Sequence, residues 1–113
     1  MLSTILFAAI VSIESGGNCL AIGDKGKAVG PAQTWAITVK DCNRILGKPV
    51  FRMEDRFSLA KSEAMFNIYT THYGKRYGMP ISDEVRAKIW NGGPTGPSKQ
   101  ATNKYWNKVK AKI

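Results

Sequence analysis

Two carboxylate side chains, Glu14 and Asp24, have contrasting surroundings in the sequence. Glu14 directly follows the apolar run from Leu2 to Ile13, at the end of a predicted helix. Partial burial and the negative end of the helix dipole both raise the pKa of a carboxyl group there. Asp24 lies in a glycine-flanked turn, where a solvated carboxylate stays ionised. A protonated and an ionised carboxyl group near each other are typical of glycoside hydrolysis. Taken singly, the two residues can also be an exposed helix-end glutamate and an ordinary turn aspartate.

The chain has few residues that could support metal-dependent or cysteine-based catalysis. The chain has one histidine, His72, and two cysteines, Cys19 and Cys42. A zinc site would need all three to converge, because such sites usually take three or four Cys or His ligands at short spacings. Neither cysteine lies in a recognisable nucleophile elbow. We therefore expect no metal and no cofactor.

The composition predicts a single folded domain over residues 1–113. The chain is 43% hydrophobic, enough to build a core. No apolar run reaches the ~18 residues that cross a bilayer, so we expect no transmembrane span. The run from Leu2 to Ile13 resembles a signal-peptide core, but it lacks a preceding Lys or Arg and a clean cleavage site. We interpret it as a helix at the centre of the domain.

The charge balance favours a polyanionic partner. Seventeen Lys and Arg residues face eight Asp and Glu residues, for a formal net charge of +9. Such a surface suits nucleic acid, an anionic membrane or an acidic cell-wall polymer. The positive residues are spread along several segments and form no recognised nucleic-acid motif, so we expect no nucleic-acid partner.

The pattern of apolar residues, caps and glycines predicts a mostly α-helical, α+β fold with about five helices and a small β-hairpin near the carboxylate pair. Ser58 and Ser82 are predicted to cap helices, and Gly47 and Gly78 to end them. The helices are expected over residues 2–15, 35–46, 58–77, 82–90 and 100–113, and the hairpin turn over residues 23–26.

Several ordered motifs resemble the lysozyme-like superfamily, and most closely its invertebrate-type (destabilase) lysozymes. The motifs are Ile13-Glu14-Ser15-Gly16-Gly17-Asn18, Asp24-Lys25-Gly26, Gly30-Pro31-Ala32-Gln33 and Ala87-Lys88-Ile89-Trp90-Asn91-Gly92-Gly93-Pro94-Thr95-Gly96, followed by Thr102 and Tyr105-Trp106-Asn107-Lys108-Val109. The resemblance runs from about residue 9 to residue 110. It implies a lysozyme-like fold.

The resemblance also implies an activity and a set of site residues. It makes Glu14 the general acid and Asp24 the second catalytic carboxylate of a muramidase, which hydrolyses the β-1,4 bond between N-acetylmuramic acid and N-acetylglucosamine. Peptidoglycan glycan strands are then the partner, bound by a monomer acting at the bacterial cell wall. The implied substrate-binding residues are Ser15, Gln33, Trp35, Tyr69, Tyr73, Trp90 and Asn91, although each aromatic residue taken singly is more typical of a core, and Gly92 and Gly93 of a structural turn.

The chain departs from the family pattern at two points. Animal members are rich in disulfides, whereas this chain has two cysteines, which indicates a bacterial or phage branch. The resemblance allows one bond between Cys19 and Cys42, while synthesis in a reducing cytosol would leave both thiols free. Trp90 stands where a histidine is often found. The sequence does not decide the export route, which can be secretion, attachment to a virion or release through a holin.

Three alternatives to a muramidase remain at this point. A lytic transglycosylase cleaves the same bond with one carboxylate. A basic binding module for nucleic acid or for the cell wall would need no catalysis. The third is a catalytically inactive wall-binding or inhibitory relative of the lysozymes.

Overall fold

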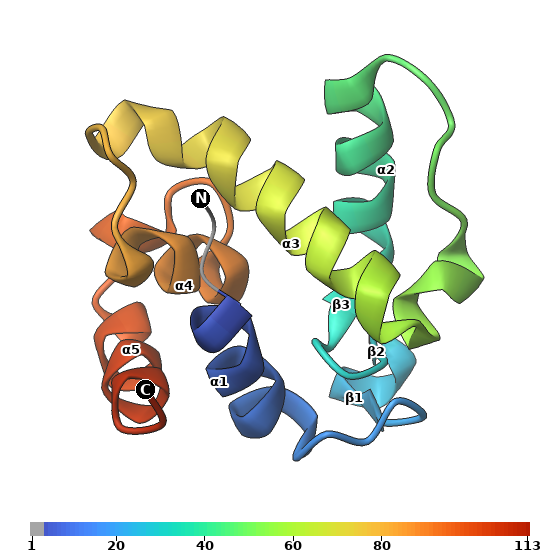
Figure 1. Cartoon of the computed structure of the whole chain (residues 1–113), viewed down its shortest axis with the longest axis horizontal. Coiled ribbons are helices and arrows are strands. Elements are labelled where there is room, and N and C mark those ends of the chain that lie inside the picture. Colours follow the sequence, from blue (N-terminus) through green and yellow to red (C-terminus); the bar gives the residue numbers. More distant parts are fainter. Residues whose placement is uncertain (1–3) are drawn as a thin grey trace.

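The computed structural model describes residues 4–113, and these form five α-helices with a small antiparallel sheet at one side (Figure 1). The mostly helical α+β fold predicted from the sequence is confirmed. Leu2 and Ser3, which the sequence places in the first helix, lie outside the described residues. The helices are α1 (Thr4–Ser15), α2 (Ala36–Leu46), α3 (Leu59–Gly74), α4 (Asp83–Gly92) and α5 (Ala101–Lys110), and the strands are β1 (Ile22–Gly23), β2 (Ala28–Val29) and β3 (Thr34–Trp35).

The helix boundaries follow the capping residues closely. The Ser58 side chain accepts a hydrogen bond from the Lys61 backbone N–H at 3.1 Å and starts α3. Ser82 does the same for α4, and Gly47 ends α2 in the left-handed conformation with φ +73°. The helix predicted to reach Tyr77 differs in its last turn. It ends at Gly74 and continues as a 3₁₀ turn over Lys75–Tyr77.

Two hydrophobic cores lie on either side of α3, which crosses the molecule diagonally in Figure 1. The first core joins α1, α5 and α4 to Phe66 of α3, and Leu6 and Ile10 are its α1 members. The second core joins α2 to the neighbouring face of α3, with Met65 and Tyr69. Because α3 and α4 both contribute to the two cores, α1 is held in a set position relative to α2.

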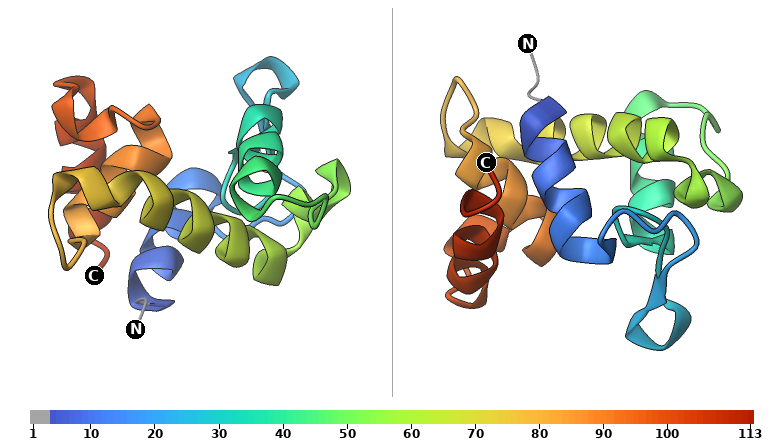
Figure 2. Two further views of the ribbon diagram at one scale, coloured as in Figure 1. Left: turned by 90° about the horizontal axis from the view of Figure 1, so that it is seen from above. Right: turned by 60° about the horizontal axis from the view of Figure 1, so that its bottom comes forward.

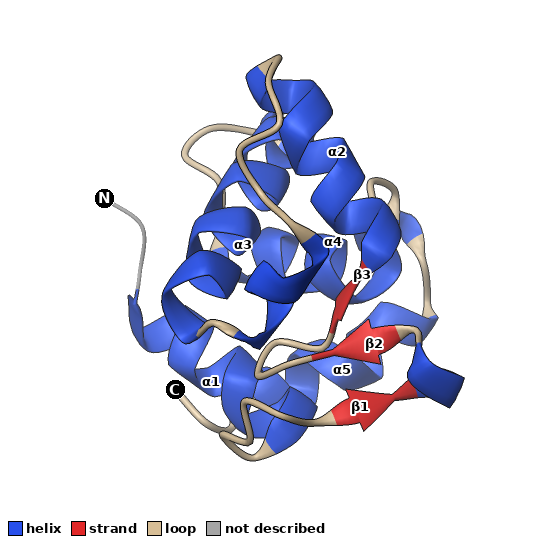
Figure 3. Ribbon diagram, turned by 90° about the vertical axis from the view of Figure 1, so that its right-hand side faces the viewer, coloured by secondary structure: helices blue, strands red, loops and turns tan. Residues whose placement is uncertain are grey.

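The sheet has three strands in the order β1-β2-β3, one strand more than the predicted hairpin. Both neighbouring pairs are antiparallel, with Ile22 opposite Val29 and Ala28 opposite Trp35. The turn between β1 and β2 projects away from the helices (Figure 2), and the sheet lies at one edge of the molecule (Figure 3). Its third strand forms because the chain reverses sharply after Gly30, whose φ is +86°.

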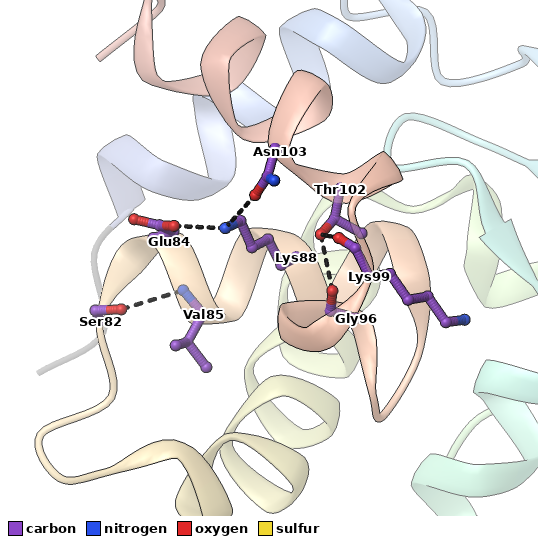
Figure 4. A network of polar contacts seen from close by, with 8 residues as sticks. All are labelled: Ser82, Glu84, Val85, Lys88, Gly96, Lys99, Thr102 and Asn103. Atoms are coloured by element: carbon purple, nitrogen blue, oxygen red, sulfur yellow. Dashed lines mark hydrogen bonds and ion pairs between the residues drawn. The ribbon is translucent and has the colours of Figure 1, made fainter.

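Polar contacts fix the corner between α4 and α5 (Figure 4). The buried Lys88 donates from Nζ to Glu84 Oε2 at 2.5 Å and to Asn103 Oδ1 at 2.8 Å. Thr102 Oγ1 donates to the Gly96 carbonyl oxygen at 2.7 Å. A Cβ atom at Gly96 would lie 1.9 Å from the Lys88 carbonyl oxygen, so the close approach of the chain requires glycine there. These contacts hold α5, and with it Tyr105, against α4.

Candidate functional site

Glu14 lies in the last turn of α1, half-buried beside the aromatic ring of Tyr105. The Tyr105 hydroxyl donates a hydrogen bond of 2.8 Å to Glu14 Oε2. Burial raises the pKa of Glu14 from 4.5 to about 7, the Tyr105 hydrogen bond lowers this pKa, and the charge of Asp24 raises it. The elevated pKa predicted from the position of Glu14 is therefore present, with desolvation as its main cause.

Asp24 faces the same cavity from the turn after β1. It is exposed and has a left-handed backbone with φ +48°. The cavity has a volume of about 150 Å³ and is enclosed by α1, the sheet and the end of α4. Six of the predicted site residues meet at this cavity, namely Glu14, Asp24, Gln33, Trp35, Trp90 and Asn91, together with Ala28.

The side-chain amide of Gln33 forms hydrogen bonds within the turn between β2 and β3 and to the residue before β1. Its Nε2 donates to the carbonyl oxygens of Gly30 at 3.0 Å and Ala21 at 3.2 Å, and its backbone φ is +53°. The amide of Asn91, in contrast, belongs to an exposed residue at the end of α4. Gln33 thus shapes the cavity, while Asn91 has an amide that can reach a bound group.

The two tryptophans of the cavity have different surroundings. Trp90 Nε1 donates to the Ala32 carbonyl oxygen at 3.0 Å, and its ring packs edge-on against Phe66 with centroids 5.3 Å apart. Trp35 is 40% exposed, with Lys27 Nζ 5.8 Å from its ring centroid. Trp90 is therefore part of the wall, and Trp35 offers an open aromatic face at the rim.

Three other predicted site residues do not line the Glu14 cavity. The Ser15 hydroxyl donates to the Pro31 carbonyl oxygen at 2.8 Å and ties the end of α1 to the sheet turn. Tyr69 and Tyr73 line a separate cavity between α2 and α3. Their predicted role in binding is not tested by this geometry and stays a prediction.

Sequence reasoning misses Tyr105 and Gly23. In the sequence, Tyr105 stands out only as part of the Tyr105-Trp106-Asn107-Lys108-Val109 motif, which gives it no role beside the carboxylates. The available signal is that the hydroxyl of a buried tyrosine usually needs a polar partner. Gly23 lies against Gln33, and a Cβ at position 23 would come 2.4 Å from Gln33 Oε1. Gly92 and Gly93 have the structural role considered above. A Cβ on Gly92 would lie 2.6 Å from Thr102 Cγ2, and Gly93 has φ +86°.

Both cysteines are free, so the bond that the family resemblance allows between them is not formed. Cys19 is exposed in the loop after α1. Cys42 is buried in the second core, where its Sγ lies 3.5 Å from the Met65 carbonyl oxygen. Burial raises the pKa of the Cys42 thiol to about 12. The two thiols therefore occupy quite different environments.

Within residues 4–113, no group of three or more His, Cys, Asp or Glu side chains is placed to hold a metal ion. The same residues include no helix long and apolar enough to cross a membrane. The cavity itself offers carboxyl groups and amides. A carboxyl group with a pKa of about 7 is protonated in about half of the molecules at neutral pH, so Glu14 can donate a hydrogen bond or a proton to a bound group.

Comparison with known proteins shows that the fold is similar to that of a chain in a solved protein complex. No family model matches the sequence, and no curated protein is similar enough to count as a relative. A chain in the crystal structure of Aeromonas hydrophila PliI in complex with Meretrix lusoria lysozyme is similar to this chain, with 27% sequence identity and a TM-score of 0.83. The match covers 97% of this chain and 89% of that chain. The lysozyme-like superfamily predicted from the motifs gains no support from a family model.

This comparison corrects the predicted function. The solved structure is one of PliI in complex with a lysozyme, and this finding overturns the muramidase prediction. The prediction of a muramidase that hydrolyses peptidoglycan is accordingly not retained. The individual site residues are not tested by the comparison and remain predictions.

Proposed function

We propose that this chain is one member of a lysozyme–inhibitor pair and that it binds its protein partner over the mouth of the Glu14 cavity. The observation that carries the proposal is the likeness to a chain of the PliI–lysozyme complex over 97% of this chain. The description of that structure names two proteins that bind each other. A chain so similar in fold and length is suited to the same kind of association.

The surface around the cavity supports a protein partner. Trp35 is 40% exposed at the rim of the cavity, and Ile22 in β1 and Leu20 before it are 65% and 74% exposed. Exposed aromatic and aliphatic side chains are typical of protein-binding surfaces. Lys25 and Lys27 are exposed on the projecting turn, and Lys27 Nζ lies 5.8 Å from the Trp35 ring centroid. The partner surface is therefore expected to be apolar at its centre and acidic at its edge.

The cavity itself can receive a side chain of the partner. Its volume of about 150 Å³ suits one side chain, and the protonated Glu14 carboxyl can donate a hydrogen bond to it. Deprotonation of Glu14 as the pH rises through about 7 removes that donor. Binding should accordingly weaken between pH 6 and pH 8 in the wild type and change less in Glu14→Gln, whose amide keeps a donor.

A binding assay with both members of the known pair tests the proposal. The chain is titrated by calorimetry with purified Aeromonas hydrophila PliI and, separately, with purified Meretrix lusoria lysozyme. We expect a stoichiometric complex with one of the two, weakened at least about tenfold by Trp35→Ala, because exposed aromatic anchors often dominate binding energy. Binding to neither protein would refute the proposal.

A cell-wall turbidity assay adds an independent readout. If the partner is the lysozyme, the chain should slow the clearing of bacterial walls by that lysozyme. Walls incubated with the chain alone are the required control, and clearing in that tube would contradict the corrected function. The two assays together separate binding from any effect on the walls themselves.

Three narrower statements belong to the same proposal. The resemblance to the invertebrate-type lysozymes, in a bacterial or phage branch, rests on the sequence motifs alone. Peptidoglycan strands as a partner of this chain have no support from the comparison. An action at the bacterial cell wall is proposed because lysozymes and the proteins that bind them meet there.

A further inference from the structure

A second cavity lies between α2, α3 and the chain after α4, and we name it the Tyr73 cavity. Its volume is about 520 Å³, larger than the Glu14 cavity. The wall from α2 uses positions 37, 40, 41 and 44, which share one helix face, and α3 contributes Tyr69 and Tyr73 one turn apart. Pro94 closes the end beyond α4.

The two cavities are neighbours along the same surface. Trp35 lines the Glu14 cavity, and Ile37, two residues on, lines the Tyr73 cavity. On the opposite side, Asn91 lines the first and Gly93 the second. Both cavities therefore lie between the start of α2 and the end of α4. A partner seated on the Glu14 cavity therefore reaches the Tyr73 cavity without crossing the molecule.

An ordered polar network of Asp41, Arg44 and Tyr73 lines the Tyr73 cavity. Asp41 Oδ2 accepts a short hydrogen bond from the Tyr73 hydroxyl, and Asp41 Oδ1 lies 2.6 Å from Arg44 Nη2. Arg44 Nη2 also donates to the Tyr73 oxygen at 2.9 Å. These contacts compensate the charge of Asp41. They also hold the ring of Tyr73, which packs edge-on against Tyr69 with centroids 5.1 Å apart.

The mouth of the cavity combines an apolar side chain with a positive charge. Ile37 is 71% exposed there, although isoleucine is among the residues most often buried. Lys40, on the next turn, is exposed and forms no ion pair within residues 4–113. A ligand for this mouth therefore needs an apolar group for Ile37 and the tyrosine rings, and a negative charge for Lys40.

We infer that the Tyr73 cavity is a second anchoring point for the protein partner, and that it takes an apolar side chain from a partner segment that also carries a carboxylate. The inference rests on the proposed function and extends it from one cavity to two. Its carrying observations are the lining residues of the two cavities that lie two positions apart in the chain on both sides, the exposed Ile37 at the mouth, and the exposed Lys40, which has no ion pair within residues 4–113. Two anchoring points fix the orientation of a partner, which one cavity does not.

The test measures the dissociation constant of the complex with two pairs of variants. Ile37→Asp places a charge at the apolar mouth, and its control is Ile5→Asp, because Ile5 is 63% exposed on α1. Lys40→Glu reverses the charge, and its control is Lys61→Glu on the exposed side of α3. All four positions are exposed, so folding should be retained, as circular dichroism will verify. The uncharged Ile37→Ser is a milder second variant.

Purified PliI and purified Meretrix lusoria lysozyme are the two probes, and the one that binds the wild type is used throughout. We expect Ile37→Asp to weaken binding about tenfold or more and Ile37→Ser about threefold. Lys40→Glu should weaken it about threefold to tenfold at low salt and much less at high salt, because salt screens exposed charges. Both controls should stay within about twofold of the wild type.

The outcomes separate the two proposals. One outcome is that the wild type binds a probe and Trp35→Ala weakens the complex. If Ile37→Asp then binds as tightly as the wild type, the second anchor is refuted while the proposed function stands. If Ile5→Asp weakens binding as much as Ile37→Asp, the effect is not specific to the cavity and the inference is equally refuted. If the wild type binds neither probe, both proposals fail.

Discussion

Tyr105 and Glu14, 91 positions apart in the sequence, are joined by a hydrogen bond of 2.8 Å from the tyrosine hydroxyl to Oε2 of the carboxylate. The bond connects α5 to the end of α1, across the first hydrophobic core. It stabilises the charged form of Glu14, whereas burial stabilises the protonated form. Burial has the larger effect, and the pKa of Glu14 settles at about 7.

The pKa of Glu14 can be measured directly. In carbon-detected NMR, we expect the Glu14 carboxyl resonance to titrate at about pH 7. Tyr105→Phe should raise that pKa further, because the variant loses a hydrogen bond to the charged form while the site stays buried. Glu14→Gln identifies the resonance. A midpoint near the ordinary 4.5 would show that water reaches the carboxyl group freely.

The same pKa makes the stability of the fold depend on pH. The folded pKa of Glu14 is raised above its unfolded value, so the stability it contributes is fully present below pH 4.5 and is lost as the pH rises through about 7. With a discount for partial solvent access, the loss should be about 2 kcal/mol at pH 8. Urea unfolding of wild type and Glu14→Gln at pH 4 and pH 8 measures it. The Glu14→Gln substitution should flatten the curve, and equal slopes for the two proteins would contradict the prediction.

The two thiols should react at very different rates. Cys19 is exposed, so one thiol per chain should react at once with a thiol reagent in the native protein. Cys42 is buried and its pKa is raised to about 12, so it should react only after unfolding. Two thiols should then be counted in denaturant without reductant. Cys19→Ser is the control that removes the fast reaction. A count of zero in denaturant would mean that a disulfide had formed.

Gly30 should be far less tolerant of substitution than Gly16. Both have positive φ, +86° and +63°, so alanine is strained at either. Only at Gly30 would the new Cβ collide with the chain, at 1.7 Å from the Arg56 carbonyl oxygen, while nothing lies within 4 Å at Gly16. We expect Gly30→Ala to lower the free energy of unfolding by about 3 kcal/mol or more and Gly16→Ala by about 1 kcal/mol. Chemical denaturation of the two variants compares them, and similar losses would contradict the close contact.

Much of the fold follows from local sequence patterns. Ser58 and Ser82 begin helices, Gly47 ends one, and the apolar run before Glu14 forms α1, because capping and hydrophobic periodicity act over only a few residues. The raised pKa of Glu14 also follows from its place at the end of that run. The sequence does not predict the third strand, since β3 depends on the reversal of the chain after Gly30.

What the sequence by itself determined are therefore the five helices, the ends set by capping residues, and the presence of a buried carboxyl group. The last turns of α3 and α5 end earlier than predicted, at Gly74 and Lys110. Only the tertiary structure decided which side chains meet. It brought Tyr105 to Glu14 and Trp90 to Ala32, and it left Tyr69 and Tyr73 in a second cavity. It also kept Cys42 inside a core, separate from the exposed Cys19. The physical reason is that such contacts join residues far apart in the chain, and their geometry depends on how whole helices pack, which local spacing does not encode.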